Sequence, residues 1–148
     1  MSAVVRRLGA GDRAAWQPLW EAYLEFYGAP QVAAGSDDVF SRLVAGADRM
    51  VGFVAEQDGR IVGFTHAMLH ASTWHAGPAC YLEDLFVAPD ARGGGVGRAL
   101  IDAVTDWARK AGAPGVHWIT QTENAAARRL YDALAELQPF VRYERPTG

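Results

Sequence analysis

Residues 81–106 constrain the fold of this chain more than any other stretch of its sequence. They open with a near-continuous apolar run over residues 81–87, which is typical of a central strand covered on both faces. Pro89 ends this run, because proline cannot donate a hydrogen bond to a strand ladder. After a glycine-rich turn, apolar side chains recur at helical spacing over residues 99–108. The sequence therefore predicts a buried strand, a tight turn and a helix in immediate succession.

The turn between this strand and helix predicts an anion site. Four of its residues are glycines flanked by two arginines, and in full it reads Arg92, Gly93, Gly94, Gly95, Val96, Gly97 and Arg98. Glycines have no Cβ, so successive backbone N–H groups can turn inward and form a concave nest. The start of the following helix adds unpaired N–H groups and the positive end of the helix dipole. We therefore expect the turn to bind a phosphate.

The spacing of the glycines narrows the kind of phosphate loop. A dinucleotide-binding turn requires glycine at its sixth position, where this chain has Arg98. A P-loop ends in Gly-Lys-Ser/Thr, which is not found here. The pattern Arg-x-x-Gly-x-Gly does fit, with Arg92, Gly95 and Gly97 at its fixed positions. This pattern resembles the coenzyme A pyrophosphate loop of the GCN5-related N-acetyltransferases, the GNAT family.

The resemblance covers roughly the second half of the chain. It extends backward through Tyr-Leu-Glu-Asp-Leu-Phe-Val at residues 81–87 and forward to Asn124-x-x-Ala-x-x-x-Tyr131. A glycine-rich turn that binds nothing is the alternative, but it does not explain two motifs in the right order and separation. Polyamine-acetylating members look most similar in motif. The resemblance implies acetyl-CoA as cosubstrate, held by Leu85, Phe86, Val87, Arg92, Gly93, Gly94, Gly95, Val96, Gly97, Arg98 and Asn124.

Strand and helix patterns along the whole chain predict one α/β domain over residues 1–148. The expected strands are residues 3–8, 50–56, 60–70, 81–87, 116–120 and 140–143. Helices are expected to follow Asp12, which we expect to cap the first of them, and to follow Ser36, Gly97 and Asn124. The family resemblance implies a mixed, mostly antiparallel central sheet of about six or seven strands, flanked by helices. It also implies splayed central strands, with the pantetheine arm of coenzyme A in the gap.

Two acidic residues interrupt the central strand, where an unpaired buried carboxylate would be costly. Because side chains alternate along a strand, we expect Glu83 and Asp84 to point to opposite faces. Asp84 is interpreted as a hydrogen-bonded structural acid. The family resemblance implies another role for Glu83, which would help to deprotonate the acceptor amine.

The resemblance implies a general acid in Tyr131, two turns into the helix that Asn124 is expected to cap. A phenol is protonated at neutral pH and can donate a proton to the leaving thiolate. A core tyrosine is the alternative. The chain departs from the family after this helix, where residues 134–137 read Leu-Ala-Glu-Leu in place of leucine-glycine. Direct transfer in a ternary complex is favoured over an acyl-enzyme on Cys80, because no histidine stands beside that cysteine in sequence.

The acceptor is less clearly indicated than the cosubstrate. Trp20, Glu25 and Trp74 are candidate substrate contacts, because aromatic and acidic side chains both attract cations. The alternative is that such aromatics are core and such acids solvated. His66 and His70 share a strand face, but no third ligand stands at a convincing spacing for zinc, so no metal is expected. We expect a small primary amine, polyamine-like or amino-acid-like, with a protein lysine or a non-catalytic acyl-CoA sensor or scaffold as alternatives.

Composition sets broader limits on partners and location. The formal net charge is −3, and no block of Lys or Arg indicates nucleic acid binding. The single cysteine excludes an internal disulfide, which favours a reducing compartment, and we expect a cytoplasmic protein. No apolar run approaches the length that spans a membrane, so no membrane partner is expected. A homodimer is common in the family and is expected here.

Overall fold

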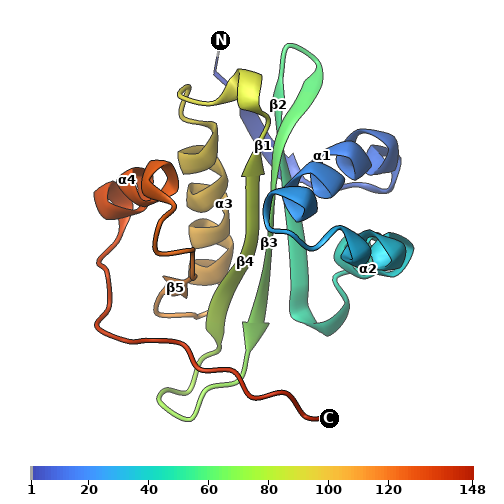
Figure 1. The fold of residues 1–148 in the computed structure, drawn as a ribbon. Helices are drawn as coiled ribbons and strands as arrows, with labels where there is room; N and C mark the ends of the chain where they lie inside the picture. The colour runs from blue at the N-terminus through green and yellow to red at the C-terminus, as the bar shows by residue number, and fades with distance from the viewer. Residues whose placement is uncertain (1) are drawn as a thin grey trace.

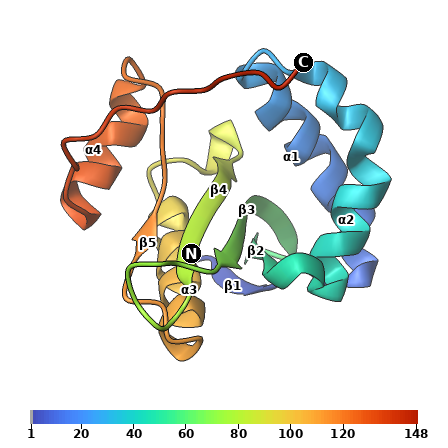
Figure 2. The same cartoon turned by 90° about the horizontal axis from the view of Figure 1, so that it is seen from below.

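The computed structural model describes residues 2–148, in which helices cover both faces of one sheet (Figure 1). Helices α1 (Arg13–Phe26) and α2 (Ser36–Ala45) lie on one face, and α3 (Val96–Lys110) and α4 (Ala125–Leu134) lie on the other side, as the view from below also shows (Figure 2). The strands are β1 (Val4–Arg7), β2 (Met50–Gln57), β3 (Arg60–His70), β4 (Ala79–Val87) and β5 (Val116–His117). Short 3-10 turns occupy Ala10–Asp12, Pro30–Gly35, Ala47–Arg49 and Pro89–Ala91.

Within residues 2–148 the sheet has five strands in the order β1-β2-β3-β4-β5, not the six or seven expected. The first four are antiparallel neighbours, and β5 runs parallel to β4. β5 pairs only with Cys80 and Tyr81, so the remainder of β4 has no strand partner on that side. The backbone groups on that side of β4 are therefore not used by a strand ladder and can form other hydrogen bonds, as the Val87 carbonyl does with Arg92 Nε.

Residues 140–143 were expected to form a last strand, and that prediction is wrong. Phe140 and Tyr143 are 80% and 91% exposed, and the segment pairs with no strand of the described chain. Figures 1 and 2 show that the chain after α4, drawn in red, crosses from α4 towards α1 and α2. A short apolar strand forms only where a neighbouring strand and a core receive it, and neither does so here. The predicted strand over residues 116–120 is likewise reduced to Val116–His117.

Each face of the sheet has its own core. On the α3 side, apolar residues at three- and four-residue spacing bury Val96, Leu100, Ile101, Val104 and Ala108 against the sheet. On the α1 side the core is aromatic, built from Trp16, Trp20, Phe40, Phe64 and Phe86. Fully burying one such side chain stabilises the fold by roughly 1.5–3 kcal/mol. The expected hairpin between β2 and β3 is confirmed, with positive φ angles of 53° at Asp58 and 75° at Gly59.

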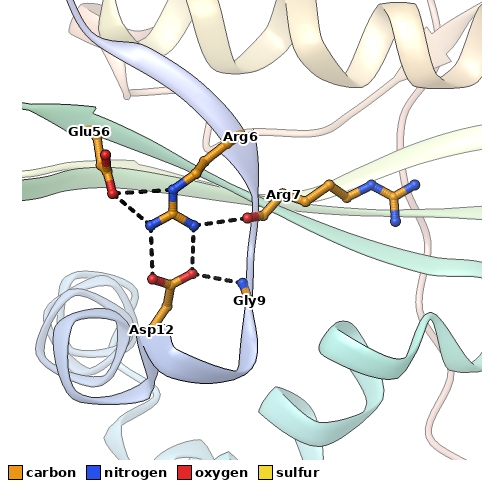
Figure 3. A network of polar contacts seen from close by, with 5 residues as sticks. All are labelled: Arg6, Arg7, Gly9, Asp12 and Glu56. Carbon is orange, nitrogen blue, oxygen red and sulfur yellow. Dashed lines mark hydrogen bonds and ion pairs between the residues drawn. The ribbon is translucent and has the colours of Figure 1, made fainter.

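Arg6 of β1 connects the sheet to the start of α1 (Figure 3). Its guanidinium donates to both carboxylate oxygens of Asp12, at 2.8 and 2.9 Å, and to Glu56 Oε1 of β2 at 2.7 Å. Asp12 also accepts from the backbone N–H of Gly9 at 2.7 Å. Asp12 therefore sits at the expected cap position of α1, but its carboxylate binds Arg6 and Gly9 instead of capping that helix. The Arg6 hydrogen bonds hold the pKa of Asp12 below its ordinary value.

Across residues 2–148, every helix is too short or too polar to cross a bilayer.

Candidate active site

The glycine turn adopts a conformation that glycine alone takes readily. Gly93 and Gly95 have φ angles of 85° and 83°, in the left-handed region. Gly95 is also the N-cap of α3, and the first hydrogen bond of the helix runs from Ala99 N to the Gly95 carbonyl. The N–H groups of residues 96–98 precede that bond and have no partner within the helix. The turn therefore presents a set of backbone donors, as the sequence predicts for an anion site.

Gly97 serves the packing of two helices. A Cβ at this position would lie 3.1 Å from Leu130 Cδ2 of α4 and 3.9 Å from Val87 Cγ2 of β4. The missing side chain thus lets α4 approach the start of α3.

The turn opens onto a cavity of about 520 Å³. Its walls come from the end of α1, from the end of β4 with the glycine turn, and from α4. Most residues expected to bind coenzyme A line it: Leu85, Phe86, Val87, Arg92, Gly93, Gly95, Val96, Gly97, Arg98 and Asn124. Gly94 lies in the same turn and, among the described residues, is the one member of the expected set outside the wall.

The chemistry of this wall suits an elongated molecule that carries a pyrophosphate. The turn supplies backbone N–H donors and the cation Arg98, and α4 supplies the cation Arg129. Leu85 and Val87 make the β4 part of the wall apolar. The side of β4 beyond Tyr81 lacks a strand partner, so its backbone can bond amide groups of a bound chain. Arg92 has a structural contact as well, since its Nε donates to the Val87 carbonyl at 2.9 Å.

Tyr131 lies on α4 at the cavity wall, as expected from the helical spacing after Asn124. Asn124 caps this helix, because its Oδ1 accepts from Ala127 N at 3.4 Å. The Tyr131 ring packs edge-on against Trp118, with the ring centroids 5.4 Å apart. Burial, with a smaller contribution from Tyr27, raises the pKa of Tyr131 to about 12. Tyr131 is therefore a protonated donor throughout the neutral range.

Glu83 and Asp84 occupy a β-bulge that sequence reasoning missed. Ala67 of β3 pairs with Leu82 and His66 pairs with Asp84, so Glu83 has no partner in the ladder. The extra residue shifts the alternation of side chains. Asp84 pairs with His66 and therefore lies on the same face of the sheet as His66. Tyr81 pairs with Met68, which lies two residues from His66 and so on the same face. Glu83, two residues after Tyr81, shares this face. The expectation that the two carboxylates point to opposite faces is wrong.

The two carboxylates differ in their surroundings. Solvent reaches the Glu83 side chain, yet partial burial and the neighbouring Asp84 raise its pKa, against the opposing effects of His66 and Arg42. Glu83 does not line the cavity itself, but its carbonyl oxygen lies 3.5 Å from the hydroxyl of Tyr23, which does. A raised pKa makes a carboxylate a better base near neutral pH.

The buried partners of Asp84 also escaped the sequence reasoning. Asp84 Oδ2 lies 2.8 Å from His66 Nδ1, and His66 Nε2 lies 3.1 Å from Trp16 Nε1. His66 is 2% exposed and Trp16 is fully buried. Polar residues in apolar strands were the available signal, but their pairing depends on the register of β3 and β4, which the bulge changes by one residue.

The structure places the three candidate acceptor contacts in very different surroundings. Trp20 is 4% exposed and stacks between Trp16 and Tyr23, so it lies in the core behind the cavity wall. Glu25 is exposed on α1, and Trp74 is 90% exposed in the loop before β4. Among the described residues, this part of the cavity wall comes from Tyr23 and Phe26 of α1 and from Tyr27, which directly follows the helix.

His66 and His70 lie on the face of β3 that the alternation predicts. The His70 ring contacts His117 of β5 at 5.8 Å between centroids, and burial, then the nearby His70, lower the pKa of His117. Residues 2–148 contain no group of three or more His, Cys, Asp or Glu side chains arranged to hold a metal ion.

Comparison with known proteins agrees with this geometry. A model of the acetyltransferase (GNAT) family matches residues 16–135. The D-amino-acid N-acetyltransferase HPA3 of Saccharomyces cerevisiae is 33% identical over 144 residues, covering 96% of this chain and 89% of the relative. The aminoglycoside N(6')-acetyltransferase type 1 of Salmonella typhimurium is 32% identical over 104 residues, covering 67% and 72% respectively.

Solved structures give the same result. The aminoglycoside acetyltransferase AAC(6')-Iy, bound to a bisubstrate analog of coenzyme A and acetylneamine, matches with a TM-score of 0.84 and 26% identity over all of both chains. The same enzyme in complex with CoA matches with a TM-score of 0.83, covering 99% of this chain and 95% of that one. Acetyl-CoA is thus the cosubstrate that these matches and the cavity both support. Because the family model spans most of the sequence and a relative aligns along nearly all of it, this chain belongs to the acetyltransferase (GNAT) family and is an acetyl-CoA-dependent N-acetyltransferase.

Proposed function

We propose that this enzyme, a single domain, transfers the acetyl group directly to a primary amine of a small cationic molecule, in a ternary complex. The observation that carries the proposal is a phenol on one wall of the cavity and a carboxylate pair next to a residue of the opposite wall. Tyr131 forms part of the α4 wall, and Glu83 and Asp84 stand behind Tyr23 at the α1 wall. The relatives' names support an amine acceptor, since they designate D-amino-acid and aminoglycoside N-acetyltransferases.

Glu83 is proposed as the base for the acceptor. An alkylammonium with a pKa near 10 is neutral only about one time in a thousand at pH 7, a penalty of roughly 4 kcal/mol. A carboxylate with a raised pKa, acting directly or through water, offsets part of this penalty. Bound acetyl-CoA supplies the acetyl group as a thioester. Tyr131 holds the proton at Oη that the leaving thiolate takes.

Cys80 supports direct transfer over an acyl-enzyme. The thiol is buried, and burial raises its pKa to about 11. The thiolate, which is the nucleophilic form, is therefore scarce at neutral pH.

A small polyamine-like or amino-acid-like amine is the acceptor class we propose. The acidic bulge next to an aromatic wall favours a cation, because each close aromatic face contributes roughly 0.5–2 kcal/mol to cation binding. The motif around Glu83 favours polyamines, whereas the relatives' names favour D-amino acids and aminoglycosides. We place the reaction in the cytoplasm, in keeping with a single, buried cysteine.

A homodimer is also proposed. The chain after α4 exposes four large apolar side chains, Leu137, Phe140, Val141 and Tyr143, by 72% to 91%. A segment that exposes this much apolar surface is costly in water and favours burial against a second copy. Sedimentation of the wild type and of Phe140→Ser checks this: we expect a dimer that the substitution weakens, and a wild-type monomer at micromolar concentration would contradict it.

The acceptor proposal is tested by kcat/KM for putrescine, spermidine, D-lysine, L-lysine, kanamycin and a lysine peptide, with wild type and Glu83→Gln. We expect a small amine to be preferred. The Glu83→Gln variant should lose about 10²-fold at pH 7 and recover as pH rises towards the pKa of the amine. Preference for the peptide would indicate a protein-lysine acetyltransferase. Acetyl-CoA binding without turnover of any amine would indicate a sensor or scaffold.

A further inference from the structure

A chain of buried polar side chains leads from the core of α1 to the cavity wall. Trp16 Nε1 and His66 Nε2 are 3.1 Å apart, and His66 Nδ1 and Asp84 Oδ2 are 2.8 Å apart. The side chains of His66 and Asp84 are 3% and 14% exposed. The Asp84 backbone is also fixed, because its carbonyl accepts from Thr65 Oγ1 at 2.8 Å. Asp84 is therefore held at both its backbone and its side chain.

The hydrogen-bond inventory fixes where the protons are. An indole Nε1 only donates, so Trp16 obliges His66 Nε2 to accept. The neutral imidazole then carries its one proton on Nδ1 and donates it to Asp84 Oδ2. Asp84 is an ionised acceptor in this arrangement, and His66 cannot take a second proton without losing Trp16. The network thus ends in a carboxylate that is ready to receive a proton.

Tyr23 connects this carboxylate to the cavity. Its ring forms part of the α1 wall, and its hydroxyl lies beside the bulge, 3.5 Å from the Glu83 carbonyl. Burial, followed by the charge of Asp84 and a hydrogen bond to it, raises the pKa of Tyr23 far above that of an ordinary tyrosine. Tyr23 therefore stays a neutral phenol. Its one proton has two acceptors within reach, the Glu83 carbonyl and the Asp84 carboxylate, while its oxygen can accept a proton from a group in the cavity.

Acylation of an ammonium needs more than one proton acceptor. Two protons leave the acceptor nitrogen between the ammonium and the amide product, whereas the thiolate takes up only one. Glu83 is reached by solvent and can pass the first proton to bulk water. The second leaves as the carbon–nitrogen bond forms, in a site from which the substrates exclude water. The solvent-exposed Glu83 does not by itself account for that second transfer.

We propose that Tyr23 and Asp84 form the relay that accepts this second proton, with His66 and Trp16 as positioning residues. The inference rests on the proposed amine acceptor. The nitrogen gives its proton to Tyr23 Oη as Tyr23 passes its own proton to Asp84, which becomes a neutral carboxylic acid. Tyr131 meanwhile gives its proton to the thiolate as the carbon–sulfur bond breaks. The proton on Asp84 then restores the Tyr131 phenol, directly or through solvent after product release, so that one proton in total reaches the bulk.

The groups around the relay are compatible with this direction of transfer. Within residues 2–148, the one contact of the Asp84 carboxylate counted among the ion pairs is with His66, which is neutral in this arrangement. The titratable or charged side chains that face the two carboxylates are Tyr23 of α1, His66 of β3, Tyr81 of β4 and Arg42 of α2. A purely structural Asp84 would require only the His66 contact and no cavity-facing phenol.

The test compares Tyr23→Phe, Asp84→Asn and the double variant, using the panel amine with the highest wild-type kcat/KM. Each single variant should lower kcat by about 10²-fold, with little change in the KM for acetyl-CoA. The double variant should be no worse than either single one, because both residues serve one step. Unlike Glu83→Gln, neither should recover at high pH, since a neutral amine still has to lose a proton on transfer. Asp106→Asn, an exposed carboxylate paired with Arg109 on α3, is the matched control and should behave as wild type.

Several results would overturn the relay while leaving the acetyltransferase function intact. One is a wild-type kcat in Tyr23→Phe, and another is a multiplicative loss of kcat in the double variant. A third is recovery of the Asp84→Asn rate at high pH, which would mean that Asp84 only supports Glu83 as the base. If Asp84→Asn fails to fold by circular dichroism, Tyr23→Phe carries the test, because it removes one oxygen and keeps the ring packing. A wild type that turns over no amine would contradict the proposed function instead.

Discussion

The two sides of β4 meet at one cavity but are built by different means. On the coenzyme side, the glycine turn and the start of α3 are contiguous, and backbone conformation alone presents the N–H donors. On the acceptor side, the active groups are side chains from three elements: Trp16 and His66 are 50 residues apart, and His66 and Asp84 are 18 apart. A backbone site can therefore be recognised from spacing, whereas a side-chain network depends on how distant strands come into register.

Among the substitutions that separate the two sides of β4, we expect the largest effect at Tyr131, the proposed proton donor. We expect Tyr131→Phe to lower kcat by about 10²–10⁴-fold, because the leaving thiolate loses its proton donor. The KM for acetyl-CoA should change little, since the ring still packs on Trp118. With a pKa of about 12, Tyr131 should also cause no loss of wild-type rate between pH 7 and 10. Steady-state kinetics across pH checks both points, and a wild-type rate in the variant would make Tyr131 a core residue only.

A substitution at Gly97 should affect the coenzyme side of β4 and leave the acceptor side intact. A valine here would place its Cβ 3.1 Å from Leu130 Cδ2, so Leu130 has to give way where α4 contacts the start of α3. Overpacking of this kind costs about 1–3 kcal/mol, and we expect acetyl-CoA affinity to fall by about 10- to 100-fold. Calorimetric titration measures the change. Gly11→Ala is the control, because its Cβ would meet nothing within 4 Å, and equal affinities in the two folded variants would contradict the assignment of the turn.

Asp12 separates stability from function on the acceptor side. Its carboxylate connects the start of α1 to β1 through Arg6 and lies outside the cavity (Figure 3). Asp12→Asn should lower the free energy of unfolding by about 1–2 kcal/mol, after allowance for the partial exposure of Arg6. The folded-state pKa of Asp12 lies below its unfolded value, so its contribution is complete above about pH 4 and is lost as pH falls further. Urea unfolding at pH 7 and pH 3 checks this. The difference between wild type and variant should shrink at pH 3, and acetyl-CoA affinity at pH 7 should be unchanged.

The same contrast explains what the sequence could predict. The strand, turn and helix over residues 81–106, the hairpin before them and the capping of α4 by Asn124 all follow from local spacing, and the structure has them. The last strand did not follow, because residues 140–143 have a strand-like pattern but no neighbour to pair with.

Three features of the acceptor side were beyond the sequence for a physical reason. The bulge at Glu83 changes the side-chain alternation of β4, and only the pairing with β3 reveals it. The contact of Trp16 with His66 requires the packing of α1 on the sheet. Trp20 has the same helical spacing as its neighbours, yet the structure places it in the core and Tyr23 at the cavity wall.

A crystal structure with coenzyme A and the preferred amine tests the division between the two sides of β4 most directly. We expect the pyrophosphate oxygens to accept hydrogen bonds from the N–H groups of residues 93–98, with the sulfur beside Tyr131. The amine nitrogen should lie within reach of the Tyr23 hydroxyl, on the side of Glu83 and Asp84. A pyrophosphate bound away from the turn, or an amine nitrogen remote from both carboxylates, would contradict the account.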